Sequence, residues 1–336
     1  MEADPFTPPP PQAPRFDASE NAWVLSRYED VVDALQNPHL WPDGAEDEAA
    51  RGIRDNAGRL RVRGEMLEAF SWARIMEWMP RMEALAGEAA GQLPAHSPLD
   101  LLADFARPWA LSLAMLAIGL DPMHRQCLAE LGLQVIAGTG EPDGSPPQLA
   151  AAHATASLER LLNGVSIPMG EPTFVGISQT FTRFLAKAWF DLIRHPDQWT
   201  RLREQPDLLP AAMDELLRHA GIVRKVVRRA VADTEAAGVG IEKGQRTFLM
   251  VGSANRDPEQ FPDPDRLDVT RKATGHVALG GGRKSCVGAL LIRTAGGVLT
   301  GALVRRFTSA ELSGETPWRV SSRFAWPEAL RVVLDC

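Results

Sequence analysis

The chain has 336 residues, of which 45% are hydrophobic, so it is long and apolar enough to bury a large core. Its formal net charge of -7 does not favour a nucleic-acid surface, and no nucleic-acid partner is expected. The three cysteines, Cys127, Cys286 and Cys336, are too few and too widely spaced for a disulfide framework. Reduced thiols, an acidic proline-containing N-terminus and the lack of a long uncharged apolar stretch favour a cytoplasmic protein without membrane insertion.

The first two thirds of the chain are predicted to be mainly helical. Residues 1–20 are proline-rich and are expected to form an extended arm, followed by a single domain over 21–336. A short strand at 22–26 and an amphipathic helix at 27–36 precede a polar, acidic loop at 37–56. Helical patterns then cover 58–92, 99–120, 148–163, 172–194 and 210–219.

The last third changes character. Residues 223–231 and 247–252 are β-rich, and a proline-dense run at 255–274 leads to a glycine-rich loop at 280–282. A final long helix is expected from 288 to about 305. No internal repeat is visible, so the sequence predicts a mainly α fold with a small β region.

One cysteine stands directly before this last helix. Cys286 follows a glycine-rich turn, and backbone N–H groups at a helix N-terminus favour a thiolate, so its pKa is expected to fall. A thiolate presented from a rigid loop suits an axial ligand of haem iron. Two simpler interpretations are a phosphate-binding loop and an ordinary buried thiol. Arg283 argues against the first, because that motif has glycine directly before its lysine.

The context of this loop points to a family. Glu215 and Arg218 stand three residues apart on a predicted helix, where they can form an ion pair. Downstream, in order, come Ala254-Asn255-Arg256-Asp257-Pro258, Phe261-Pro262-Asp263-Pro264-Asp265-Arg266-Leu267-Asp268 and the loop from His276 to Gly288. Together they resemble the cytochrome P450 family in residues, order and spacing. The resemblance implies the P450 fold and a haem b cofactor.

The resemblance also assigns roles to individual residues. Cys286 matches the ligand of the haem iron, and Glu215, Arg218 and Arg266 match a structural triad that holds the haem-binding core. Two haem propionates need charge-assisted hydrogen bonds from several elements. The positions that match cofactor contacts are Arg59, Arg63, Arg228, His276 and Lys284, the last in place of the usual histidine.

The oxygen-activation motif departs from the family pattern. Thr180 matches its threonine, but the preceding carboxylate is replaced by Gln179, and Ile177 follows Gly176 where the pattern has glycine. An amide forms hydrogen bonds but does not titrate, whereas the missing acid helps to relay protons. Two interpretations remain open: Ser178, Thr180 and water carry the protons, or the enzyme uses peroxide or performs chemistry other than hydroxylation.

The expected function is monooxygenation of a small organic molecule with O2 and two electrons. The resemblance implies ferredoxin and ferredoxin reductase as donors, with an acidic partner surface meeting Arg283 and Lys284. The alternative from another class is a non-catalytic haem protein that binds or senses a ligand. Arg224, with Gly176 and Ile177, is a candidate substrate contact. The chain is short between 119 and 176, which predicts an open pocket or closure by a partner or a second copy in a homodimer.

Overall fold

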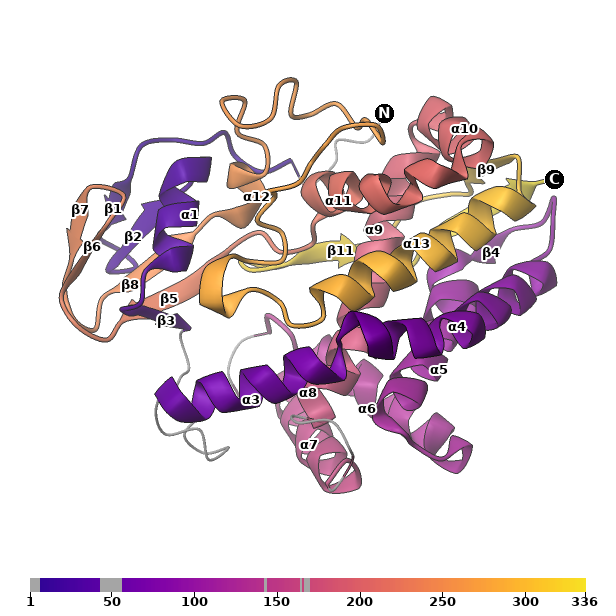
Figure 1. Ribbon diagram of the computed structural model, residues 1–336, viewed down its shortest axis with the longest axis horizontal. Coiled ribbons are helices and arrows are strands. Elements are labelled where there is room, and N and C mark those ends of the chain that lie inside the picture. The colour runs from indigo at the N-terminus through magenta and orange to yellow at the C-terminus, as the bar shows by residue number, and fades with distance from the viewer. Residues whose placement is uncertain (1–6, 43–55, 142–143, 164, 166–169) are drawn as a thin grey trace.

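The computed structural model describes residues 7–42, 56–141, 144–163, 165 and 170–336 (Figure 1). Helices predominate. The five-stranded sheet, together with α1, lies at one end of the molecule, whereas β4 and β9 lie near the C-terminus at the other end. The α-helices are α1 (Tyr28–Gln36), α3 (Asn56–Ala69), α4 (Trp72–Gln92), α5 (Arg107–Ile118), α6 (Arg125–Ala137), α7 (Pro146–Leu161), α8 (Gly170–Val175), α9 (Phe181–Ile193), α10 (Pro196–Glu204), α11 (Leu209–Ala220), α12 (Val251–Ala254) and α13 (Ala289–Arg306).

The main sheet has the strand order β1-β2-β8-β5-β3. It is mostly antiparallel, with β2 and β8 forming its parallel pair. Three smaller sheets pair β10 with β11, β6 with β7, and β4 and β9 with β12. The strands are β1 (Arg15–Asp17), β2 (Ala22–Leu25), β3 (Leu40–Pro42), β4 (Leu99–Asp100), β5 (Val226–Ala230), β6 (Thr234–Ala236), β7 (Val239–Ile241), β8 (Arg246–Leu249), β9 (Ser309–Leu312), β10 (Trp318–Val320), β11 (Ala325–Pro327) and β12 (Arg331–Asp335).

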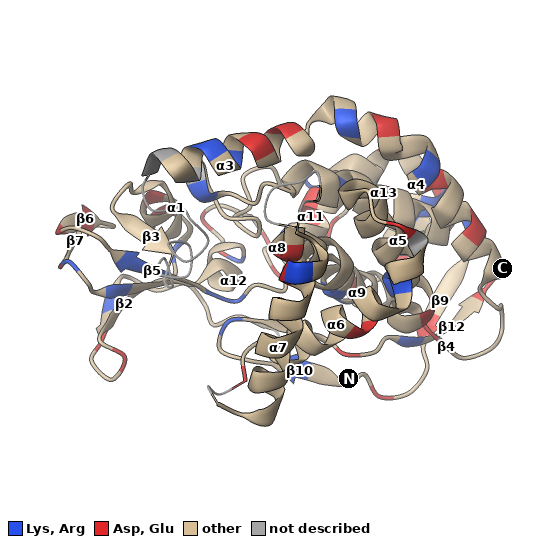
Figure 2. Ribbon diagram, turned by 90° about the horizontal axis from the view of Figure 1, so that it is seen from below, with Lys and Arg blue, Asp and Glu red and all other residues tan. Residues whose placement is uncertain are grey.

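Helix α9 forms the centre of the core. All of its residues from Phe181 to Ile193 are buried, because neighbouring elements surround it on every face. A π-helical turn, η3 (Gly176–Thr180), joins α8 to α9 in one continuous helical rod. Figure 2 shows α3 and α4 along one side of the molecule and α6 and α7 toward the other. The π-helical turn η3 packs against α5, α6 and α8.

Most predicted elements are present, and the differences have local causes. The predicted helix over 58–92 is two helices, because the chain breaks at Phe70 and Ser71 between α3 and α4. The hairpin of β6 and β7 was not predicted; Ala237 and Gly238 both adopt positive φ at its tip. Part of the predicted N-terminal arm is strand β1, which pairs with β2.

One helical stretch in the described residues, Leu101–Ile118, is long and apolar enough to cross a membrane, and 67% of it is buried inside the fold. It consists of a π-helical segment, η1 (Leu101–Ala106), and α5. Asp104 and Arg107 interrupt its apolar character. Its hydrophobicity therefore agrees with its place in the core.

Candidate active site

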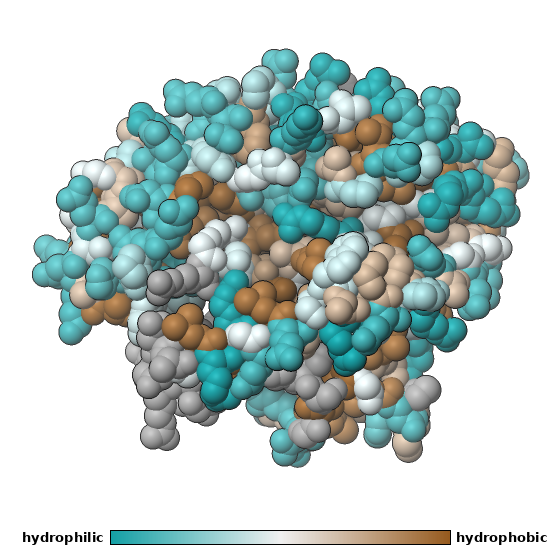
Figure 3. Space-filling model, viewed as in Figure 1, coloured by the Kyte–Doolittle hydropathy of each residue, from teal (hydrophilic) through white to brown (hydrophobic). Residues whose placement is uncertain are grey.

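A cavity of about 430 Å³ lies between the central helix and the loop before α13. Its walls come from α3, α5, the continuous helix α8–η3–α9, the turn after α11, the loop from His276 to Gly288 that carries Cys286 (the cysteine loop) and α13. Few polar side chains reach it: Thr173, Thr180, Ser285 and Cys286. The face in Figure 3 is mostly hydrophilic, with apolar patches gathered near its centre. The cavity has the size and apolar walls typical of a small-molecule site.

The cysteine loop presents a thiol to this cavity. Gly280 and Gly282 adopt positive φ values of 72° and 62°, which a residue with a side chain would adopt only under strain. The Cys286 N–H donates to the Leu279 carbonyl oxygen at 2.7 Å and so closes the turn. Gly288 is the N-cap of α13. Cys286 therefore lies directly before the N-terminus of α13, as the sequence predicts.

The pKa of the Cys286 thiol does not follow the prediction. Burial raises the pKa, and it outweighs the hydrogen bond from Gly288 and the charges of Arg63 and Arg293, which lower it. The helix terminus and the cations are thus too weak to offset the loss of water around the sulfur. A cation directly at the sulfur would reverse this balance, as a metal ion deprotonates a coordinating thiol.

The π-helical turn η3 brings three residues predicted to face oxygen or substrate to the same cavity. Gly176, Ile177 and Thr180 all line it. A π-helical turn inside a longer helix widens the backbone locally and is common at functional sites. Thr180 is therefore placed to contact a molecule in the cavity.

Gln179 lies on a different face of this turn. It is buried and does not line the main cavity but a second, smaller one. Arg183 Nη1 donates to Gln179 Oε1 at 3.0 Å, and Gln179 Nε2 donates weakly to Ser178 Oγ at 3.4 Å. A Cβ atom on Gly132 of α6 would lie 2.7 Å from the Gln179 amide nitrogen, so the glycine makes room for it. Gln179 therefore acts on the main cavity only through its neighbours.

Two of the predicted arginines fit an anionic cofactor. Arg63 donates to the Ser285 carbonyl oxygen at 2.8 Å and to Ser285 Oγ at 2.9 Å, beside the cysteine. Arg228 on β5 is buried, its Nη1 donates to the Val227 carbonyl oxygen at 3.1 Å, and its Nε has no acceptor. A buried guanidinium with an unused N–H calls for an acceptor, and a carboxylate is the strongest one. The side chain of Arg59 lies outside the described residues.

Three other predicted contacts, Lys284, Arg224 and His276, bind groups within the protein and, like Arg63 and Arg228, do not line the cavity. Their roles as cofactor or substrate contacts stay predictions. The Lys284 ammonium donates to the carbonyl oxygens of Leu40 and Asn37, away from the cavity. Arg224 donates to the Ser321 carbonyl oxygen at 3.3 Å and does not line the cavity.

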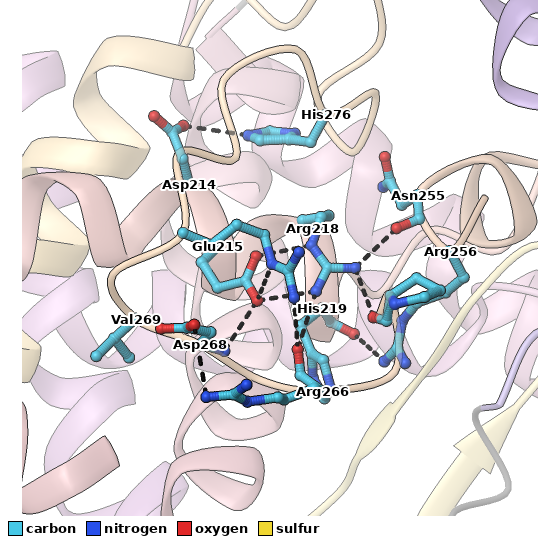
Figure 4. Close-up of polar contacts among 12 residues, drawn as sticks. Asp214, Glu215, Arg218, His219, Asn255, Arg256, Arg266, Asp268, Val269 and His276 are labelled. Carbon is cyan, nitrogen blue, oxygen red and sulfur yellow. Dashed lines mark hydrogen bonds and ion pairs between the residues drawn. The ribbon is translucent and has the colours of Figure 1, made fainter. Parts of the chain in front are cut away.

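His276 is the third. Its Nε2 lies 3.2 Å from Asp214 Oδ1, and its Nδ1 accepts the Ala278 N–H at 3.2 Å, so both ring nitrogens are occupied within the protein (Figure 4). Arg293 donates to the same Asp214 oxygen at 2.6 Å. His276 thus belongs to a buried network with Asp214 instead of contacting the cavity.

The structural triad is present with one member exchanged. Glu215 and Arg218 are fully buried and joined by two hydrogen bonds of 2.7 and 2.8 Å (Figure 4). Arg266 does not contact Glu215: its side chain is 65% exposed and lies 3.8 Å from Asp268. The third arginine is Arg271, whose Nε donates to Glu215 Oε1 at 3.2 Å. The Arg266 prediction was wrong because both arginines stand on the same irregular segment, and spacing alone does not say which one turns inward.

Comparison with known proteins identifies the family. A family model described as Cytochrome P450 matches residues 194–333. Cytochrome p450 CYP199A2 of Rhodopseudomonas palustris is 30% identical over 308 residues, which cover 83% of this chain and 74% of that protein. Cytochrome P450 107B1 of Saccharopolyspora erythraea is 29% identical over 349 residues, covering 90% and 86%. The crystal structure of the versatile cytochrome P450 enzyme CYP109B1 from Bacillus subtilis superposes with a TM-score of 0.84 at 21% identity, over 95% of each chain.

These likenesses define an oxidoreductase that works with a haem cofactor. The chain belongs to the cytochrome P450 family, as its motifs predicted, and its fold is the P450 fold. It is a cytochrome P450 monooxygenase.

Proposed function

We propose that this P450 inserts one oxygen atom of O2 into a small, mainly apolar organic substrate, using two electrons from a ferredoxin-type donor in the cytoplasm. One observation carries the proposal: the thiol of Cys286 and the hydroxyl of Thr180 line the same apolar cavity, although they are 106 positions apart in the chain. A ligand group and a hydroxyl on the walls of one dry cavity are the minimum that this chemistry needs.

The cofactor in this proposal is haem b. Cys286 would ligate its iron, and Arg63 and Arg228 would hold its two propionates, with Arg59 as a further candidate by resemblance. The unused N–H of buried Arg228 supports this assignment, because a propionate oxygen would satisfy it. When bound, the haem supplies the oxidising chemistry that transfers the oxygen atom.

The protein's own contribution is a dry site with a single well-placed hydroxyl. Thr180 orients water and oxygen by donating or accepting a hydrogen bond at its Oγ1. Gly176 and Ile177 leave the space beside it for substrate, and the apolar walls exclude bulk water. Met66, Phe70 and Phe184 favour an apolar substrate. Linalool 8-monooxygenase of Pseudomonas putida, 28% identical over 323 residues, is named for such a substrate.

A second candidate, peroxide-driven oxidation, has one observation in its favour. Gln179 stands where the family has a titratable acid, and its side chain is held by Arg183 away from the cavity. Protons then reach the cavity only through hydroxyls such as Ser178 and Thr180 or through water. Peroxide already carries the electrons and protons that the O2 route must deliver.

The electron donor is proposed to dock beside the cysteine loop. Of the two residues expected to meet it, Lys284 is engaged by backbone carbonyl oxygens, and the Arg283 side chain lies outside the described residues. The backbone of η5 (Gly282–Lys284) forms this surface. An Arg283→Glu variant should lower turnover with a reductase system and leave peroxide-supported turnover unchanged.

Isotope labelling distinguishes the two routes. The haem-loaded protein is supplied with a ferredoxin, a ferredoxin reductase, NADPH and a panel of apolar substrates under 18O2, and products are analysed by mass spectrometry. Incorporation of one 18O atom supports the proposal. Product formed only with peroxide selects the second candidate. Substrate binding without product in either system contradicts both and favours a ligand-binding protein.

A further inference from the structure

A second cavity, of about 200 Å³, meets η3 at Gln179, which does not line the main cavity. It is enclosed by the first turns of α5, by α6 and by Gln179, and these elements pack against one another. Figure 2 shows α5, α6 and α9 grouped in this part of the molecule. Gln179 forms its buried inner wall, while Pro108 and Leu133 are exposed at its rim, so the cavity is open to small solutes.

Positive charge gathers on the walls of this cavity. Arg107 and Arg125 line it, and no acidic residue does. Arg125 donates to Ser112 Oγ and to the Pro108 carbonyl oxygen, each at 2.8 Å, and Arg107 donates to the Glu328 carbonyl oxygen at 3.3 Å. All these acceptors are neutral. Neither arginine forms an ion pair within the described residues.

Arg183, behind Gln179, adds to this charge. It is 5% exposed, and its Nη1 binds only the neutral oxygens of Gln179 and Thr182. Burial, together with the nearby charges of Arg107 and Arg319, lowers the pKa of Arg183 to about 9, so it is still protonated at neutral pH.

Two carboxylates act on Arg107, Asp100 and Glu328, and both are held by other groups. Asp100 Oδ1 accepts the N–H groups of Leu102 and Leu330, each at 2.9 Å. Glu328, which also acts on Arg183, accepts a hydrogen bond of 2.8 Å from Arg319 at its Oε1. The Nε atoms of Arg107 and Arg183 are buried and have no acceptor among the residues that the structure describes. Unsatisfied donors on buried cations are costly and rare in folded proteins. Neither Asp100 nor Glu328 therefore forms an ion pair with Arg107 or Arg183 in the part of the chain that the structure describes.

We infer that this cavity binds a short-chain monocarboxylate from solution. Its carboxylate would accept hydrogen bonds from Arg107 and Arg125, since guanidinium groups recognise a planar carboxylate in pairs of hydrogen bonds. The remaining walls, Leu111, Ala129 and Leu133, are apolar and suit a short alkyl tail. The site is separate from the oxygen chemistry of the main cavity, and its occupancy does not depend on the proposed function.

The test is calorimetric titration of the haem-loaded protein with sodium formate, acetate, propionate and butyrate at constant ionic strength in sodium chloride. We expect saturable binding that tightens about two- to fourfold with each methylene group. The absorption spectrum of the haem should stay unchanged, because the main cavity is not occupied. Carboxylates that shift this spectrum and bind nowhere else would overturn the inference, as would binding that chloride matches.

Variants locate the site. Arg107→Gln and Arg125→Gln should each weaken propionate binding at least tenfold, while Arg74→Gln, on the exposed face of α4, should not change it. Because the arginine variants also lose internal hydrogen bonds, Leu133→Trp provides an independent test. It fills the cavity from the rim without removing a charge and should abolish binding, whereas Leu149→Trp on α7 should have no effect. Unaltered binding in Arg107→Gln and Leu133→Trp would refute the site.

Gln179→Glu gives the opposite perturbation. A carboxylate at this position faces Arg183 and places negative charge on the cavity wall. It should weaken propionate binding by about tenfold or more, because the variant repels the ligand and neutralises part of the positive charge. Equal or tighter binding in this variant would contradict the electrostatic basis of the inference.

Discussion

Replacement of Arg271 should destabilise the protein far more than replacement of Arg266. The Arg271 side chain is 15% exposed and is paired with the fully buried Glu215. Its guanidinium also donates to the carbonyl oxygens of Pro262 at 2.6 Å, Asp263 at 3.1 Å and Arg266 at 3.2 Å. Removal of one partner from a buried pair costs about 3–5 kcal/mol, and we expect Arg271→Ala to cost about 3 kcal/mol, since Arg218 still pairs with Glu215.

Arg266→Ala is the matched control on the same segment. This side chain is 65% exposed, and its nearest carboxylate, Asp268, is 3.8 Å away. Exposed ion pairs contribute little, so the cost should be below about 0.5 kcal/mol. The backbone carbonyl oxygen of Arg266, which accepts from Arg218 and Arg271, is kept in this variant.

The assay is urea unfolding of the haem-loaded variants, followed by far-ultraviolet circular dichroism and by haem absorbance in parallel. Coincidence of the two signals establishes that a single free energy of unfolding is being compared. An Arg266→Ala variant that loses as much stability as Arg271→Ala would refute the exchange of the third arginine. If Arg271→Ala and Arg266→Ala both leave the free energy of unfolding nearly unchanged, the pairing of Arg271 with Glu215 does not stabilise the fold.

Three further predictions concern other parts of the site and core. Burial raises the pKa of Asp191, but the charges of Lys187, 2.6 Å away, and His219 outweigh it and hold the pKa below its usual range. The Asp191 carboxylate therefore stabilises the fold fully above the unfolded pKa of about 4, and this stabilisation is lost as pH falls below it. Asp191→Asn should lower the free energy of unfolding by about 3 kcal/mol at pH 7. Urea unfolding of this variant should show a flatter loss of stability below about pH 4. Arg228→Leu should weaken haem retention about tenfold or more, measured by transfer to apomyoglobin, without destabilising the haem-free protein, because it removes a buried guanidinium whose Nε lacks an acceptor within the described residues. Unchanged retention would contradict the propionate assignment. Thr180→Ala should lower the ratio of product to NADPH consumed while substrate affinity stays the same, and an unchanged ratio would show that Thr180 takes no part in proton delivery.

The residues that sequence predicted well are those whose neighbours are close along the chain. Glu215 and Arg218 meet because a helix brings positions three apart to one face. Cys286 is fixed by the turn that its own N–H closes and by the helix that follows. Thr180 reaches the cavity because it stands on a continuous helical rod, where one residue fixes the orientation of the others. Local geometry is enough in each case.

The contacts that sequence did not predict are made by long side chains whose partners are distant in sequence. Lys284 turns to Leu40, 244 positions away, and Arg224 turns to Ser321, 97 positions away. His276 is held by Asp214, 62 positions away. Helix periodicity and motif spacing carry no information about such partners, because tertiary packing alone decides which acceptor is within reach.

The break between α3 and α4 was missed for a related reason. Leu67, Phe70 and Met76 continue the apolar spacing across it, so periodicity alone indicates one helix. Ser71 adopts an extended conformation as the N-cap of α4, and serine at an N-cap is the one signal that could have revealed the boundary. The pKa of Cys286 was mispredicted because burial, which sequence does not show, exceeds the effect of the helix terminus.

Whether Cys286 binds the haem iron as a thiolate is decided by the absorption difference spectrum of the dithionite-reduced protein with and without carbon monoxide. We expect a strongly red-shifted Soret band in the unaltered protein and its loss in Cys286→Ala, while Cys127→Ala, at an exposed cysteine, keeps it. A band at the position of a haem with a neutral ligand, or the same spectrum in Cys286→Ala, would show that Cys286 is not the thiolate ligand.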